Sequence, residues 1–342
     1  MGEGTAAMQR RTLLLSGLHS GLAATALAAT GLVGTGLARP GLARAQAATP
    51  LRIIVPAPPG GPTDILARAL AERAQPALGR PVVVDNRAGA GGIIGTEAAA
   101  RSAPDGDTIV LGHNQTHASN QAMMARLPYH VSESFAPVAK LATVHHALVV
   151  PANSPSATLA ALIARGKQGR LTYASSQAGS ASHVIAETLV RREKLDATHV
   201  PYRGAAPAAT DTVAGIVDFY IATFPSVAGL VRDGRLRALE IGAPARLADF
   251  PDVPTAAEAG APYLAVDAWF GLFAPAGTPD AAIQRIARAM LDALGEAEVE
   301  ARLMAAGFTL DPLLPAPFGA FQRQEIARWA EMVKLTGVTM EG

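Results

Sequence analysis

Short β-branched segments alternate with helix-like segments along most of this 342-residue chain. Gly, Pro, Asn or Asp bound the strand-like segments, and the helix-like segments carry apolar residues at helical spacing. Parallel strands need a crossover that packs on the sheet, so this alternation predicts an α/β fold of mostly parallel sheets flanked by helices. The predicted strands are residues 51–55, 82–85, 108–112, 147–150, 171–174, 198–200, 217–223 and 236–241.

The C-terminal third is predicted to be mostly helical. Its helices are expected at 280–294, 296–306 and 318–335, after earlier ones at 64–78, 93–101, 182–193 and 207–214. Thr255 and Glu258 have the spacing of a capping box, which predicts one further short helix. Trp269, Phe270 and Phe273 are predicted core residues. The alternation of strand-like and helix-like segments, taken alone, indicates one long α/β chain without a domain boundary.

The N-terminal segment has the features of an export signal. Arg10-Arg11 begins a twin-arginine pattern, a weakly apolar Gly/Ala-rich stretch covers 22–37, and small-residue cleavage candidates follow at 43–47. We therefore expect residues 1–47 to be a twin-arginine signal peptide that is removed, leaving a soluble periplasmic protein. Without that segment 25 basic and 27 acidic residues remain, and no basic stripe suggests nucleic-acid binding.

The chain contains no cysteine. This excludes disulfides, thiolate metal sites, a cysteine nucleophile and a lipidated N-terminal cysteine. No apolar run after the signal is long enough to span a bilayer, and no motif predicts a cofactor.

A glycine turn joins the first predicted strand to its helix. It contains Pro59, Gly60, Gly61, Thr63 and Asp64. The first N–H groups of a helix lack intrahelical partners and favour an anion, which makes this turn a candidate ligand site. The alternative is a well-capped turn in which Thr63 or Asp64 is the N-cap. An Asp64 carboxylate facing a ligand cleft would repel a carboxylate and favour an amine.

A second junction follows the strand at 171–174. Gly179, Ser180, Ser182 and His183 offer hydroxyl and N–H groups at a helix start, although Ser180 or Ser182 also suits a plain N-cap. Ligands of α/β proteins usually bind at the carboxyl ends of parallel strands. Two such junctions at one cleft therefore favour a binding site.

Other motifs are weaker. The glycines at 89–92 do not complete a dinucleotide-binding pattern, because Ile94 stands where the last glycine is required. His113 and His117 are spaced i, i+4 without an accompanying carboxylate, so no metal site is predicted. Ser182 and His183 are adjacent in sequence, which is poor geometry for a nucleophile and its base, and no third orienting group is evident.

The ordered set of motifs resembles the extracytoplasmic solute receptors of the tripartite tricarboxylate transporter family, the Bug-type binding proteins. The resemblance covers nearly the whole mature chain. It rests on PPGGPTD at 58–64, RAGAGG at 87–92, APDGDT at 103–108, THASN at 116–120, GSASH at 179–183, PYRG at 201–204, PDVPTAAEAG at 251–260 and PAGTP at 275–279.

The resemblance implies a type II-like periplasmic binding fold whose two lobes close on a small carboxylate. Lobe 1 is then residues 48–147 plus 243–342, and lobe 2 is residues 148–242. In the family, the segments matching Pro59–Asp64 and Gly179–His183 contact the ligand, and those matching Asn114, Thr116 and Thr223 lie near it. Ala57, Asp107 and Ala222 depart from the usual family residues.

The expected function is a monomeric, non-catalytic receptor that delivers a small organic acid or amino acid to a tripartite tricarboxylate-type membrane transporter. One alternative is the ligand-binding component of a sensor system. Another is a periplasmic hydrolase that uses Ser182 or His183. The ligand itself stays open among dicarboxylates, tricarboxylates, amino acids, aromatic acids and neutral amides.

Overall fold

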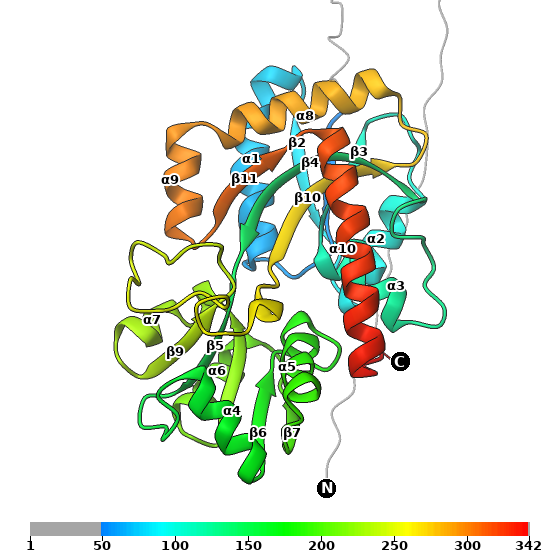
Figure 1. Ribbon diagram of the computed structural model, residues 1–342. Coiled ribbons are helices and arrows are strands. Elements are labelled where there is room, and N and C mark those ends of the chain that lie inside the picture. Colours follow the sequence, from blue (N-terminus) through cyan, green and yellow to red (C-terminus); the bar gives the residue numbers. More distant parts are fainter. Residues whose placement is uncertain (1–48, 341–342) are drawn as a thin grey trace, which may run out of the picture. The chain divides into compact units, whose positions relative to one another are not determined.

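The computed structural model describes residues 49–340, so the predicted signal peptide lies outside the described residues. Its strands form two sheets (Figure 1). The first sheet has the order β11-β4-β10-β3-β1-β2 and the second has the order β7-β6-β8-β5-β9. The strands are β1 (Leu51–Val55), β2 (Val82–Asn86), β3 (Thr108–His113), β4 (Phe135–Val144), β5 (His146–Pro151), β6 (Leu171–Ser175), β7 (Ala197–Pro201), β8 (Phe219–Thr223), β9 (Leu236–Ile241), β10 (Ala268–Pro275) and β11 (Thr309–Leu313).

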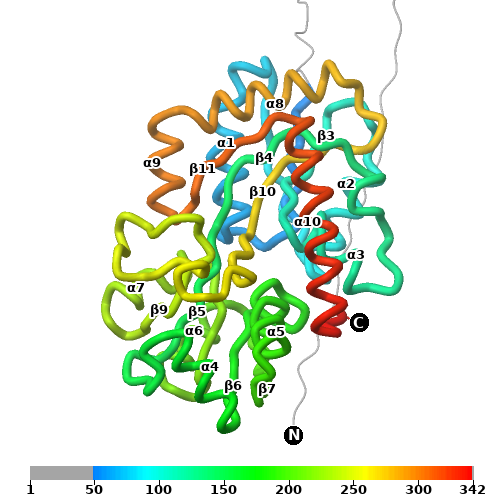
Figure 2. The backbone as a smooth tube through the Cα atoms, viewed as in Figure 1, coloured from blue at the N-terminus to red at the C-terminus, as the bar shows by residue number. Residues whose placement is uncertain are grey.

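Helices flank both sheets, which confirms the predicted two-lobed α/β architecture; we call each sheet with its helices a lobe (Figure 2). The α-helices are α1 (Pro62–Leu78), α2 (Ile93–Ala100), α3 (Asn120–Met123), α4 (Leu159–Gln168), α5 (Ala181–Glu193), α6 (Ala205–Val213), α7 (Ala228–Arg232), α8 (Asp280–Leu294), α9 (Ala297–Ala305) and α10 (Pro315–Thr336). None of the helices within residues 49–340 is long and apolar enough to cross a membrane.

Both sheets are mixed, so the prediction of mostly parallel sheets was wrong. In the first sheet, β1 pairs in parallel with β2 and β3, whereas β10 runs antiparallel to β3 and β4, and β11 runs antiparallel to β4. In the second sheet, β6 is parallel to β7 and β8, and β5 is antiparallel to β8 and β9. The strands β4, β10 and β11, which the sequence pattern missed, contribute all the antiparallel pairs of the first sheet.

The strand residues of the first sheet divide between two layers of core. Along β10, Phe270 and Leu272 pack on the same side as α1 and α8, whereas Trp269 and Phe273 pack on the side of α10. This follows from the two-residue period of a strand, which sends successive side chains to opposite faces. Trp269 is 1% exposed and donates its indole N–H to Glu325 at 3.0 Å, so it is a core residue as predicted.

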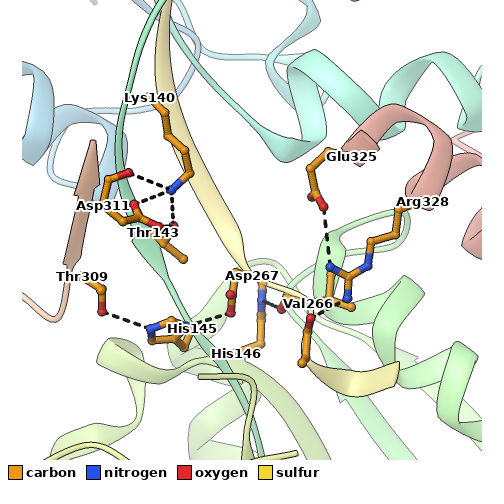
Figure 3. Close-up of polar contacts among 11 residues, drawn as sticks. Lys140, Thr143, His145, His146, Val266, Asp267, Thr309, Asp311, Glu325 and Arg328 are labelled. Atoms are coloured by element: carbon orange, nitrogen blue, oxygen red, sulfur yellow. Dashed lines mark hydrogen bonds and ion pairs between the residues drawn. The ribbon is translucent and has the colours of Figure 1, made fainter. Parts of the chain in front are cut away.

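The chain passes between the sheets at two places, and polar side chains tie them together (Figure 3). The first passage is the single residue between β4 and β5, His145, whose Nδ1 lies 2.9 Å from Asp267. The second passage runs from β9 to β10 and includes Val266, whose carbonyl oxygen lies 2.9 Å from Nδ1 of His146. His145 and His146 therefore both bond to the second passage, the first at Asp267 and the second at Val266.

Thr255 and Glu258, in the segment between β9 and β10, form the predicted capping box, but no α-helix follows it. Thr255 N–H donates to Glu258 at 2.8 Å, and Glu258 N–H donates to the Thr255 hydroxyl at 3.1 Å. The segment then continues as a turn, so the predicted short helix was wrong. Gly260 takes a φ of +81°, which ends this turn, and a separate short 3-10 helix begins at Pro262.

Candidate functional site

The residues predicted to bind ligand lie at the carboxyl ends of parallel strands in both sheets. In the first sheet, the turn at 59–64 follows β1, and Asn114 and Thr116 follow β3. In the second sheet, residues 179–183 follow β6, and Thr223 is the last residue of β8. Within each sheet the two strands named share a direction, because β1 is parallel to β3 and β6 is parallel to β8.

Asp64 organises the turn between β1 and α1. Its carboxylate accepts the Gly60 N–H at 2.9 Å and the Asn86 side-chain amide at 2.9 Å, and it forms an ion pair with Arg68 at 2.9 Å. The Asn86 amide also reaches the carbonyl oxygen of Ala57 at 3.2 Å. Gly60 has a φ of +85°, a conformation that glycine adopts without strain. Asp64 therefore closes the loop ahead of the helix, and the N-cap residue is Gly61.

The contacts of Asp64 also settle its charge. Burial favours the neutral acid, but hydrogen bonds from Arg68, Gly60 and Asn86 outweigh it and lower the pKa of this carboxyl. Asp64 is 3% exposed and ionised at neutral pH, and Arg68 balances its negative charge.

The start of α1 keeps free N–H groups. The first intrahelical bond runs from Ile65 N–H to Gly61 at 3.0 Å. Gly61 makes no side-chain cap, and within the described residues the N–H groups of Gly61, Thr63 and Asp64 donate no hydrogen bond. Thr63, the second residue of this helix, is 5% exposed as a whole. Such donors at a helix N-terminus fit an anion.

The start of α5 is held by its own serines. Ser180 is the N-cap, and its hydroxyl donates to the Gln177 carbonyl at 2.6 Å. The Ser182 oxygen accepts the Ser176 N–H at 2.9 Å and lies 3.0 Å from the Ser180 oxygen. The N–H groups of Ala181 and Ser182 have no acceptor among the described residues. This junction therefore offers two backbone donors beside a hydroxyl cluster.

His183 is neutral. Its Nδ1 accepts the Gly179 N–H at 3.1 Å, and its ring stacks on His199 with 3.7 Å between centroids. Burial, with a further contribution from His199, lowers the pKa of His183 to about 4. The ring consequently presents Nε2–H as a neutral donor at pH 7.

The loop after β3 is polar but mostly enclosed. Thr116 is fully buried, and its hydroxyl oxygen accepts the His113 N–H at 3.1 Å. Asn114 is 2% exposed, and its side-chain nitrogen has no partner within residues 49–340. An unpaired buried amide is costly, which favours Asn114 over Thr116 as a donor to a bound molecule. Thr223 is half-buried, and its hydroxyl donates weakly to Ser226 at 3.4 Å.

One side chain shows that the strand ends of the two sheets meet. A Cβ added to Gly91, in the loop after β2, would lie 2.5 Å from Cε of Met340. A Cβ added to Gly179, in the loop after β6, would lie 2.5 Å from Cγ of the same methionine. The two glycine loops therefore flank a single side chain, and the free helix N-termini belong to edges that face each other.

A separate hollow of about 490 Å³ also lies between the lobes, lined by residues that include Phe224, Phe250 and Gly307. Its lining is largely apolar. Its arginine, Arg232, lies over the Phe250 ring at 5.1 Å. This hollow has neither of the two helix starts described above and is the poorer anion site.

The described part of the chain lacks any group of three or more metal-ligating side chains placed to hold an ion. A serine–histidine contact does occur, between Ser175 and His199 at 2.6 Å, but Ser175 is fully buried and closed to a substrate.

The sequence pattern of the tripartite tricarboxylate transporter family receptors matches residues 66–338. The chain belongs to this receptor family. It is 39% identical to BugT of Bordetella pertussis over 297 residues, which cover 86% of this chain and 91% of that protein. The resemblance inferred from the ordered motifs is thereby confirmed.

Solved structures of similar proteins share the two-lobed fold. The periplasmic binding protein BugD is 30% identical, with a TM-score of 0.72 over 85% of this chain and 98% of that one. MatC of Rhodopseudomonas palustris, solved with bound malate, is 34% identical, with a TM-score of 0.70 over 83% and 98%. An R. palustris protein solved with adipate is 31% identical, with a TM-score of 0.75 over 85% and 99%.

Proposed function

We propose that this receptor binds a small organic carboxylate between the free helix starts of α1 and α5. The observation that carries the proposal is the set of unpaired backbone donors at Gly61, Thr63, Asp64, Ala181 and Ser182, on two strand edges that face each other. Each helix start suits one anionic group. Malate and adipate in the related R. palustris structures support this ligand class.

Charge near the site favours an anion. The only acid in the two helix starts, Asp64, is neutralised by Arg68. Arg203, in the loop after β7, is exposed and forms no ion pair within residues 49–340, so its charge is available for attraction. The loop carrying Arg203 is joined to the α5 junction by the Gly204 N–H, which donates to the Ser176 carbonyl at 2.7 Å.

In the proposed binding cycle the two lobes close on each other. The chain segments near His145 and Ile241 that link the two sheets act as the hinge. The proposed lobes are residues 48–147 with 243–342, and residues 148–242. Ligand shifts the population toward the closed form only as far as it binds that form better. The closed receptor, a monomer in the periplasm, then docks on a tripartite tricarboxylate-type membrane transporter; a sensor protein is the alternative partner.

No catalytic step is proposed. Ser182 and His183 do not bond each other, because His183 Nδ1 is occupied by Gly179 and the Ser182 oxygen is occupied by Ser176. A hydrolase using this pair would lack the base contact that activates a serine.

A ligand screen tests the proposal directly. Malate, adipate, citrate, amino acids and neutral amides are added separately to the purified protein, and thermal unfolding is followed. A carboxylate at about 100 times its Kd should raise the free energy of unfolding by roughly 2.7 kcal/mol and the midpoint by a few degrees. A response to amides with none to carboxylates would contradict the proposed ligand class.

The serine cluster gives a second prediction. The double variant Ser180→Ala/Ser182→Ala should weaken carboxylate binding by up to a few kcal/mol, since hydrogen bonds to charged groups contribute about 1.5–3 kcal/mol each. Isothermal titration calorimetry measures the change, with Ser102→Ala as the matched control because Ser102 closes the end of α2, away from both helix starts. If the double variant kept wild-type affinity, neither hydroxyl would contribute to ligand binding.

A further inference from the structure

The C-terminal tail after α10 is held in a defined position against the site. Gly337, with a φ of +68°, ends α10, and Val338 is 6% exposed in the main core. The Met340 N–H then donates to the Met123 carbonyl at 3.0 Å. Figure 2 shows this last helix in red with the tail at its lower end. The backbone bond and the buried valine together hold the backbone of the tail at Met340.

The Met340 side chain touches loops from both lobes. In the first lobe it lies against Gly91 and accepts a weak bond from the Gln115 amide, with 3.6 Å between nitrogen and sulfur. In the second lobe it lies against Gly179, next to the N-cap of α5. Gln115 is flanked by Asn114 and Thr116, and Gly179 bonds His183. Two of the loops that Met340 contacts, those with Gln115 and Gly179, therefore carry proposed ligand-binding residues.

The fit between Met340 and these loops requires close approach. A Cβ at either glycine would lie 2.5 Å from the methionine, far inside van der Waals contact, so only glycine admits the side chain there. Both glycines also have positive φ, +63° and +74°, so a substitution would strain the backbone as well as displace Met340. A thioether suits such a seat because it is unbranched and polarisable.

The helix before the tail also spans the two lobes. α10 packs on β4 of the first lobe and on α5 of the second. Its Arg328, which Figure 3 labels, donates to the carbonyl oxygen of Ala265 in the passage between β9 and β10. The tail thus follows an element that already contacts both lobes, and Met340 lies against Gly91 and Gly179.

We propose that Met340 is a positioning residue of the ligand site: a C-terminal latch that sits between the loop after β2 and the loop after β6 and slows ligand release. This inference rests on the proposed function for its ligand. It predicts that the latch acts on the lobes even without ligand, because the contacts with Gly91 and Gly179 form within the protein itself.

The lobe separation is measured first, without ligand. The chain has no cysteine, so Ala164→Cys on α4 and Gln284→Cys on α8 accept spin labels at exposed sites of the two lobes. Met340→Ala should broaden the distance distribution or shift it to longer distances in double electron–electron resonance. Identical distance distributions for the wild-type protein and Met340→Ala would overturn the latch, whichever ligand the cleft binds.

Ligand kinetics are measured second, with malate and adipate as probes in stopped-flow experiments. Met340→Ala should raise the dissociation rate about tenfold and leave the association rate nearly unchanged, as is usual for contacts made in the closed complex. The control Met304→Ala removes a methionine from α9 that is 58% exposed, and should change neither. Tighter binding by Met340→Ala would mean that Met340 occupies ligand space, and would overturn the latch.

The distance measurement and the ligand kinetics test the latch and the proposed function separately. If wild type binds neither acid, the carboxylate assignment fails for these probes, while the distance measurement still decides whether Met340 holds the lobes. A normal thermal midpoint for Met340→Ala shows that the variant is folded, so a change in rate or distance is not a loss of structure.

Discussion

Replacing Asp64 with alanine is expected to weaken carboxylate binding about 10- to 100-fold and to destabilise the fold by roughly 2–4 kcal/mol. The Asp64 carboxylate holds Gly60, Asn86 and Arg68 at 2.9 Å each. Without the carboxylate the loop before α1 loses these three contacts. The free N–H groups of α1 then lose the fixed geometry that a bound anion needs. Calorimetric titration and chemical unfolding measure the two effects.

The controls for Asp64 separate its contacts from its charge. Asp280 also lies in the first turn of a helix, α8, but it is exposed and its side chain only accepts a long bond from Gln284 at 3.4 Å. Asp280→Ala should therefore cost only a few tenths of a kcal/mol. Asp64→Asn keeps an acceptor for Gly60 and should fall between wild type and alanine. An Asp64→Ala variant with wild-type affinity would show that the loop geometry does not control binding.

Replacing Glu240 with glutamine is expected to flatten the pH dependence of stability between about pH 4.5 and pH 8. Glu240 is 1% exposed at the end of β9, and its Oε1 accepts the Leu148 N–H at 2.9 Å, at a register shift between β5 and β9. Its Oε2 has no partner within residues 49–340. Burial, together with the negative charge of Asp267, raises the pKa of Glu240 to about 8.

The sign follows from proton linkage. Above pH 4.5 the unfolded chain loses this proton while the folded protein keeps it up to about pH 8. Stability therefore falls as pH rises through this window, at about 1.4 kcal/mol per pH unit for one group. Glutamine does not titrate and keeps an acceptor for Leu148, so Glu240→Gln should be the more stable protein at pH 8.

Unfolding free energies at several pH values measure the Glu240 effect, and the difference between variant and wild type cancels the other titrating groups. Glu240→Ala provides the contrast, because it leaves the Leu148 N–H unpaired and should destabilise by about 1–3 kcal/mol at every pH. Parallel pH profiles for wild type and Glu240→Gln would show that Glu240 is ionised in the folded state.

The parallel strands were predictable because each ends at a clear turn signal. The missed strands have physical reasons. β10 is buried on both faces, so its run AWFGLFAP lacks alternation and cannot be told from a buried helix. β11 is an edge strand that contains Asp311 and Pro312, residues that count against a strand. β4 contains Pro137 and the buried Lys140, whose partner Asp311 is distant in sequence.

The two helix-start junctions were also predictable, since glycine and serine mark them in the sequence. The role of Asp64 was not, because the choice between facing a cleft and closing a loop depends on Asn86, 22 residues away, as well as on Gly60. Met340 was missed entirely. Its glycine seats lie 249 and 161 residues earlier, and no local pattern links them to the tail.

The position of β10 in the first sheet has a consequence for how the chain folds. In the sheet β10 lies between β3 and β4, but in the sequence all the strands of the second sheet come between β4 and β10. Until residues 268–275 are available, β3 exposes one unpaired edge and β4 has no partner on either edge, because β11 comes later still. Unpaired edges are a template for aggregation. The second sheet comes from one uninterrupted segment, residues 146–241, and has all its strands earlier. We therefore expect chains that stop before Ala268 to aggregate through the unfinished sheet, and the slow step of folding to be the insertion of β10.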